Sequence, residues 1–101
     1  MAIKHTYERT SKEKITDICD SMKDLLLYKN EKYGDSALKP NHIFYKGDST
    51  NSIKIRLDDK IGRIKNSEET SVNDVADIIG YCVLLLASLD VDKSDIERLK
   101  D

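Results

Sequence analysis

The chain has 101 residues, of which 36 % are charged and 39 % are apolar, and its formal net charge is −2. This length supports one domain with one hydrophobic core, and the composition excludes an intrinsically disordered chain. The small negative charge lacks the basic footprint of a protein that binds duplex DNA. We recognise no signal peptide and no apolar run long enough to cross a membrane, so we expect no membrane partner and a cytoplasmic location.

The first ten residues form a polar N-terminal arm that ends in a helix start signal. Thr10 and Glu13 have the spacing of a capping box, which predicts a helix over residues 11–33. Apolar residues recur in this segment with a period of 3.6, which predicts one buried stripe: Ile15, Ile18, Cys19, Met22, Leu25, Leu26 and Tyr33. Lys29 lies inside the stripe, where its ammonium either reaches water or holds an anion.

The stretch "EKYGDSAL" (31–38) ends this helix and opens a long irregular segment from Gly34 to Ser52. Loops of this length are uncommon in compact domains unless they bind something. Gly34 permits a sharp turn, because it adopts positive φ at low cost. The segment and the residue before it carry groups able to stack on a base and hydrogen-bond its edge: Tyr33, Asp35, Ser36, Asn41, His42 and Tyr45. A lone His42 is equally an ordinary surface residue.

A second helix is predicted over residues 50–65, with Ile53, Leu57, Ile61 and Ile64 on its core face. Its flank carries Arg56, Asp59, Lys60 and Arg63, at spacings i, i+3, i+4 and i+7. Two arginines on one flank suit bidentate recognition of phosphate. The alternative is a ladder of surface ion pairs, Arg56 with Asp59 and Asp59 with Arg63.

A third helix follows Thr70-Ser71, with Ser71 and Asp74 as its capping pair. Its lower part is predicted to bury one apolar stripe: Val72, Val75, Ile79, Cys82, Val83 and Leu86. Beyond Gly80 the helix is apolar nearly all round, and such a helix must be buried on every side. A partner subunit is the simplest cover, so we expect a homo-oligomer formed through this helix.

The opposite face of the third helix is polar, with Asn73, Asp74, Asp77 and Tyr81. Carboxylates at i and i+3, such as Asp74 and Asp77, are able to share Mg²⁺. The alternative is stabilisation of these carboxylates by the helix dipole, which suits Asp74 better than Asp77. A short last helix is predicted over residues 92–100, capped near Asp92 or Ser94.

The two cysteines, Cys19 and Cys82, each fall in an apolar helical stripe and match no metal-ligand spacing. We expect buried, reduced thiols. The whole pattern predicts an all-α fold in a single domain, residues 1–101: a small bundle of three main helices plus a short C-terminal helix, with a long ordered loop between helices 1 and 2.

Three segments, "KNEKYGDSAL" (29–38), "SIKIRLDDKIGRIKN" (52–66) and "NDVADIIGYCVLL" (73–85), resemble the nucleotide modification associated domain of small phage and bacterial proteins. That family is distantly similar to MazG-type all-α nucleoside triphosphate pyrophosphohydrolases. The resemblance covers about residues 25–85. It implies a nucleotide ligand and these site residues: Lys29, Tyr33, Gly34, Asp35, Ser36, Arg56, Asp59, Lys60, Arg63, Asp77 and Tyr81.

The chain departs from the MazG pattern at the metal ligands. MazG-type enzymes carry Glu-x-x-Glu on one helix and Glu-x-x-Asp on the next, whereas this chain has Arg56-x-x-Asp59 and Asp74-x-x-Asp77. Asp59, Asp74 and Asp77 would hold one Mg²⁺ at most, and the arginines suit direct contact with phosphate. The sequence therefore supports nucleotide binding better than hydrolysis.

Three hypotheses remain open. In the first, Mg²⁺ held by Asp59, Asp74 and Asp77 activates water against a di- or triphosphate, with Asp59 and Asp77 catalytic. In the second, the protein sequesters a nucleotide, such as a cyclic signalling nucleotide, between subunits without turnover and so blunts a nucleotide-based defence. In the third, the chain is a structural helical module. In the first two, the loop closes over the nucleotide, phosphates meet Lys29 and the arginines, and the base meets the tyrosines.

Overall fold

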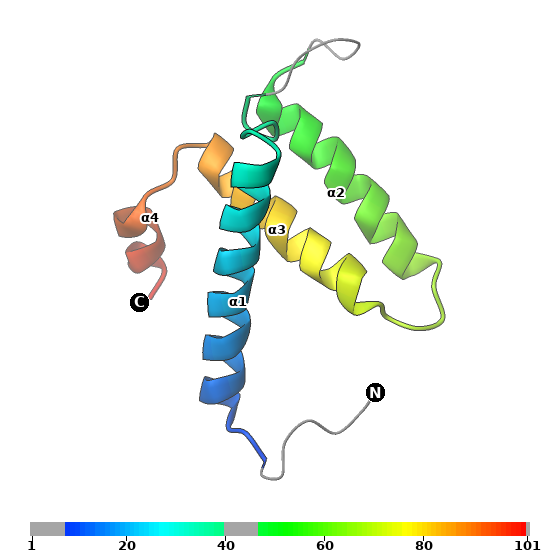
Figure 1. The fold of residues 1–101 in the computed structure, drawn as a ribbon, viewed down its shortest axis with the longest axis vertical. Coiled ribbons are helices and arrows are strands. Elements are labelled where there is room, and N and C mark those ends of the chain that lie inside the picture. Colours follow the sequence, from blue (N-terminus) through cyan, green and yellow to red (C-terminus); the bar gives the residue numbers. More distant parts are fainter. Residues whose placement is uncertain (1–7, 40–46, 101) are drawn as a thin grey trace.

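The computed structural model describes residues 8–39 and 47–100, and within them every regular element is helical. The helices are α1 (Ser11–Lys32), α2 (Ser49–Lys65), α3 (Val72–Ser88) and α4 (Lys93–Glu97), followed by a 3₁₀ turn at Arg98–Lys100. Figure 1 shows α2 and α3 as a helical hairpin, with α1 lying across α3. The predicted all-α fold of three main helices and a short C-terminal helix is confirmed.

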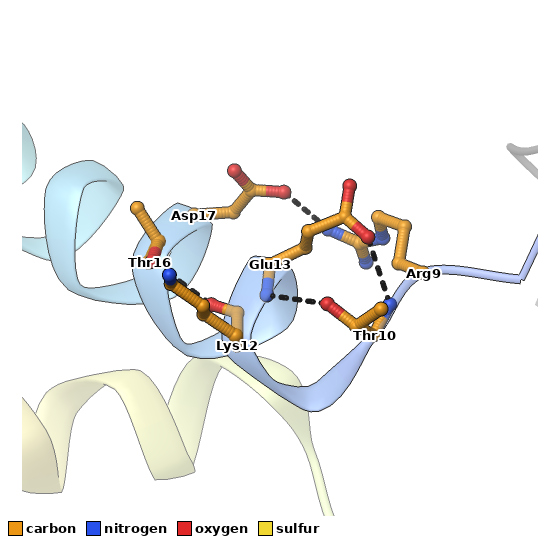
Figure 2. Close-up of polar contacts among 6 residues, drawn as sticks. All are labelled: Arg9, Thr10, Lys12, Glu13, Thr16 and Asp17. Atoms are coloured by element: carbon orange, nitrogen blue, oxygen red, sulfur yellow. Dashed lines mark hydrogen bonds and ion pairs between the residues drawn. The ribbon is translucent and has the colours of Figure 1, made fainter.

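The start of α1 is built by the predicted capping box (Figure 2). The Glu13 backbone N–H donates to Thr10 Oγ1 at 3.1 Å, and the Thr10 N–H donates to Glu13 Oε1 at 3.0 Å. These bonds satisfy amide groups that a helix start leaves without partners. Arg9 adds an ion pair to Asp17 at 2.6 Å, which holds the described end of the arm against α1.

The core of the molecule lies between α2 and α3. Ile53 is the fully buried side chain of the described residues, with 1 % of its surface exposed, while Leu57 and Ile64 are half-buried. At the open end of the hairpin, Thr50 Oγ1 lies 2.9 Å from Ser88 Oγ. Because the Ser88 hydroxyl donates to the Leu85 carbonyl, Thr50 donates this bond and ties the start of α2 to the end of α3.

Helix α1 packs on α3 but not on α2 within the described residues. It approaches α3 at Gly80, where a Cβ atom would lie 3.1 Å from Leu26 Cδ2 and 4.0 Å from Met22 Cε. Gly80 is buried, so the missing side chain is what lets the two helices come close. No residue of α1 itself is buried.

Four expectations about burial are wrong for the single chain. The α1 stripe predicted to be buried is mostly exposed, with Ile15 at 62 % and Tyr33 at 60 %, because α1 packs on α3 alone among the described helices. The α3 stripe predicted to be buried is largely exposed, with Val72 at 72 %, because α2 packs on the other side of α3. Ile61 is also exposed, since α2 packs on one neighbour and buries only a narrow strip. Both cysteines are exposed free thiols rather than core residues, because they lie on the same uncovered faces.

The C-terminal helix α4 begins where predicted, at Asp92, which forms a capping box with Asp95. The Ser94 hydroxyl donates to Asp92 at 2.7 Å, and this bond, followed by the Asp95 backbone N–H, lowers the pKa of the Asp92 carboxyl. Among the described residues, no single helix is long and apolar enough to span a membrane.

Candidate functional site

The polar flank of α2 is present as predicted. Arg56, Asp59 and Arg63 are exposed, while Lys60 is half-buried towards α3. Asp59 forms no ion pair with either arginine among the described residues, so the expected surface ladder is not seen. The guanidinium groups of Arg56 and Arg63 therefore lie on one flank of α2, and Asp59 on the same flank forms no ion pair with them.

Lys60 and Asp77 join the two helices of the hairpin. Lys60 Nζ lies 3.0 Å from Asp77 Oδ2, and the two side chains are only 16 % and 19 % exposed. This pair brings together two residues that the sequence singled out on separate helices. In the free protein, Asp77 is thus the counterion of Lys60.

The polar stripe of α3 faces inward. Asp77 contacts α2, and Asp74 and Tyr81, one turn to either side of it, are half-buried, whereas Asn73 is exposed. The apolar stripe on the opposite side of α3 faces solvent. The half-buried side chains of α3 therefore include polar residues as well as the apolar Ile78, Leu84 and Leu85.

The single chain does not assemble the predicted magnesium site. Among residues 8–39 and 47–100, no three His, Cys, Asp or Glu side chains are grouped so that they could hold a metal ion. Asp59 lies on the exposed flank of α2, while Asp77 is occupied by Lys60. The donor set of Asp59, Asp74 and Asp77 therefore does not fit one shared ion here, and Mg²⁺ binding by these residues stays a prediction.

The turn after α1 contains the predicted left-handed glycine. Gly34 has φ +66°, and Asp35 follows it with φ +61°. An aspartate in this region is strained unless its surroundings hold it there. The Asn30 amide donates to Asp35 Oδ1 at 2.7 Å, and the Asp35 N–H donates to the Asn30 carbonyl at 3.0 Å. Sequence reasoning did not single out Asn30, although an amide side chain five residues before the aspartate of a Gly-Asp turn is a usable signal.

The other loop residues are only partly placed. Tyr33 and Ser36 are exposed, and Lys29 is exposed at the end of α1. The Lys32 ammonium lies 5.6 Å from the centre of the Tyr33 ring and 5.8 Å from the centre of the Tyr28 ring. Sequence reasoning did not single out Lys32 or Tyr28. No hydrogen bond or ion pair of the described residues joins this turn to Arg56 or Arg63. Asn41, His42 and Tyr45 lie outside the described residues.

The comparisons with known proteins add no relative to this picture: no family model, no curated protein and no solved structure matches the chain.

Proposed function

We propose that this protein binds a nucleotide through its phosphate groups, along the arginine flank of α2, and holds it without cleaving it. The observation that carries the proposal is the set of two exposed arginines beside the half-buried Lys60–Asp77 pair. The guanidinium groups of the arginines are accessible to a ligand. A phosphate group of that ligand would replace the Asp77 carboxylate as the partner of the Lys60 ammonium.

The spacing of the arginines indicates the kind of ligand. Arg56 and Arg63 are seven residues apart, so they share one flank and lie roughly 10 Å apart along the helix axis. Guanidinium groups bind phosphate oxygens in a bidentate manner and keep their charge at every physiological pH. This separation suits a ligand with two phosphate groups, or a polyphosphate chain, better than a single phosphate.

The position of Lys60 supports the same reading. A partly buried ion pair contributes little to stability compared with an apolar pair of similar volume, so its presence at the α2–α3 contact favours a functional role. A phosphate that reaches this contact would compete with the Asp77 carboxylate for the Lys60 ammonium. The resemblance to nucleotide modification associated domains points to the same lysine and arginines.

Binding without turnover is the simpler form of the proposal, because it requires the cations and the turn but not a metal. The departures from the MazG pattern at Arg56 and Asp74 favour it too. Sequestration of a cyclic signalling nucleotide, and an anti-defence role for a phage-encoded protein, are specific versions of this hypothesis.

A nucleotide panel tests the proposal. We would incubate the purified chain with NTPs, dNTPs and cyclic di- and trinucleotides, with and without Mg²⁺, and record thermal shift and ligand mass in the same samples. We expect a rise in melting temperature with ligand of unchanged mass. Release of phosphate or pyrophosphate that depends on Mg²⁺ would show an enzyme instead. No shift with any ligand would contradict nucleotide binding.

A matched pair of variants locates the site. The double variant Arg56→Gln/Arg63→Gln should weaken binding roughly a hundredfold, because it removes two charge-assisted contacts. Lys54→Gln/Lys65→Gln removes the same charge from exposed residues on the other side of α2. Equal losses in both variants would show that only net charge matters and would refute the proposed flank.

Asp77 gives a second, opposite prediction. Asp77→Asn should raise the affinity for the phosphate ligand several-fold, since Lys60 loses its competing carboxylate. It should also lower the free energy of unfolding by about 1–2 kcal/mol, because a half-buried ammonium is left without its partner. Asp58→Asn, on the exposed side of α2, is the control. Loss of binding or turnover in Asp77→Asn would favour the metal-dependent alternative.

A further inference from the structure

One face of the molecule combines the uncovered stripes of two helices. We call it the α1–α3 face, and it consists of Ile15, Ile18, Met22 and Leu25 from α1 with Val72, Val75, Ile79, Val83 and Leu86 from α3. Most of these side chains are exposed in the single chain, among them Val72 at 72 % and Ile15 at 62 %. Large exposed apolar patches on a folded chain mark interaction surfaces.

The two helices enclose a groove on this face. The groove has a volume of about 550 Å³ and lies between the first half of α1 and the first half of α3. Ile18 and Met22 form one wall, and Val72, Val75 and Ile79 form the other. Such a groove between two apolar helices is shaped to receive the side chains of another helix.

The apolar side chains of this face lack cover in the single chain. Seven of the nine are exposed, whereas Met22 and Ile79 are half-buried. An ordinary stable interface buries about 800 Å² on each partner, with apolar side chains at its centre. A contiguous set of nine apolar side chains on two helices is suited to form such a centre.

We propose that the α1–α3 face is the interface of a two-fold dimer, and that a second copy of this chain occupies the groove. Two helices with adjacent apolar stripes complete a four-helix bundle when two copies meet face to face, since each copy supplies the half that the other lacks. The dimer leaves α2 on the outside, so the inference does not depend on nucleotide binding.

Charge favours a second copy over a membrane or a nucleic acid. The α1 segment contains five lysines against five carboxylates, and the two carboxylates of α3 lie on its other side, where Asp77 contacts Lys60 of α2. Two copies of such a surface approach without like-charge repulsion. An anionic lipid surface or a phosphate backbone would instead require an excess of basic residues beside the apolar stripe.

Sedimentation velocity of the full chain over a dilution series tests the dimer. The wild type should sediment with twice the 11.5 kDa mass of one chain and dissociate on dilution. Ile15→Glu should weaken the dimer roughly tenfold or more, because it buries an unpaired carboxylate in the interface. Leu27→Glu is the matched control, since Leu27 lies on the other side of α1 and is equally exposed, at 62 %.

The exposed thiol of Cys82 gives an independent readout. Cys82 lies on α3 beside this face, so in a Cys19→Ser background, which leaves Cys82 as the labelled thiol, association should slow its labelling by a water-soluble maleimide. In this background the labelling rate should rise on dilution, while the circular dichroism remains helical. This measurement decides the question even if Ile15→Glu fails to fold.

Two results would overturn the inference. One is a wild-type chain that stays a folded monomer at every concentration, with a constant labelling rate of Cys82 in the Cys19→Ser background. The other is equal dissociation by Ile15→Glu and Leu27→Glu, which would place the interface elsewhere.

Discussion

The α2–α3 hairpin and α1 are built from similar amphipathic sequence, but they differ in how much of their apolar surface the single chain buries. The hairpin contains Ile53, which is buried completely, and a polar layer around Lys60 and Asp77. Helix α1 is the longest helix, yet none of its residues is buried, and it meets α3 near Gly80.

This difference separates two properties that amphipathic patterns are often taken to predict together. Caps and a 3.6-residue period determine whether a segment is helical, and α1 has both. Burial depends on how many neighbours the rest of the chain supplies. The hairpin finds its neighbour within the chain, whereas α1 presents a stripe that its own chain leaves largely uncovered.

The largest expected effect is loss of the hairpin core. Ile53→Ala should lower the free energy of unfolding by about 2–4 kcal/mol, because it leaves a cavity between α2 and α3. Ile55→Ala, on the same helix but 57 % exposed, should change it by less than about 0.5 kcal/mol. Urea unfolding followed by circular dichroism measures both. Similar losses in the two variants would show that this contact is not the core.

A smaller effect should distinguish the two helical glycines. Gly62→Ala on α2 should stabilise the protein by about 0.5–1 kcal/mol, since a new Cβ meets nothing within 4 Å and alanine favours the helix. Gly80→Ala gains the same propensity but places its Cβ 3.1 Å from Leu26 Cδ2. We expect a smaller gain or a net loss, measured by thermal unfolding. An equal gain at both sites would mean that α1 does not approach α3 closely.

The smallest expected effect is the pH dependence of the start of α1. The Thr10 backbone N–H, followed by its hydroxyl, lowers the pKa of Glu13 below its ordinary value of 4.5. Since the carboxylate has the lower pKa in the folded state, its stabilisation is complete above pH 4.5 and is lost as the pH falls below that value. NMR titration and amide exchange at Glu13 measure this loss.

The Glu13→Gln variant tests the cause, because glutamine completes the same capping box without a titrating group. It should keep α1 protected across the acidic range. A protection profile that still falls with acid in Glu13→Gln would assign the effect to another group.

Much of the secondary structure could be predicted, because its signals are local. Thr10 with Glu13, Ser71 with Asp74, and Asp92 each begin a helix where the sequence indicated. Gly34 has the positive φ expected of it. Burial could not be predicted in the same way. Val72 and Ile61 belong to clear apolar stripes, but whether a stripe is covered depends on which helices meet in space.

In the candidate site, too, the features local to one helix could be predicted, and the contacts between helices could not. Helical spacing grouped Arg56 with Arg63 correctly on one flank, because that grouping concerns one helix. The Lys60–Asp77 pair joins two helices, and nothing local to either residue indicates the other. The bond between Thr50 and Ser88 is likewise invisible in the sequence, since it depends on the antiparallel register of α2 and α3.

The place of α1 on α3 also has a consequence for synthesis on the ribosome. Translation produces α1 first, but its described partner is not complete until residue 88 has been added. Helices α2 and α3 meet soon after they emerge, because only residues 66–71 separate them. During that interval the nascent chain displays the apolar stripe of α1, and we expect chaperones to engage the chain through this stripe.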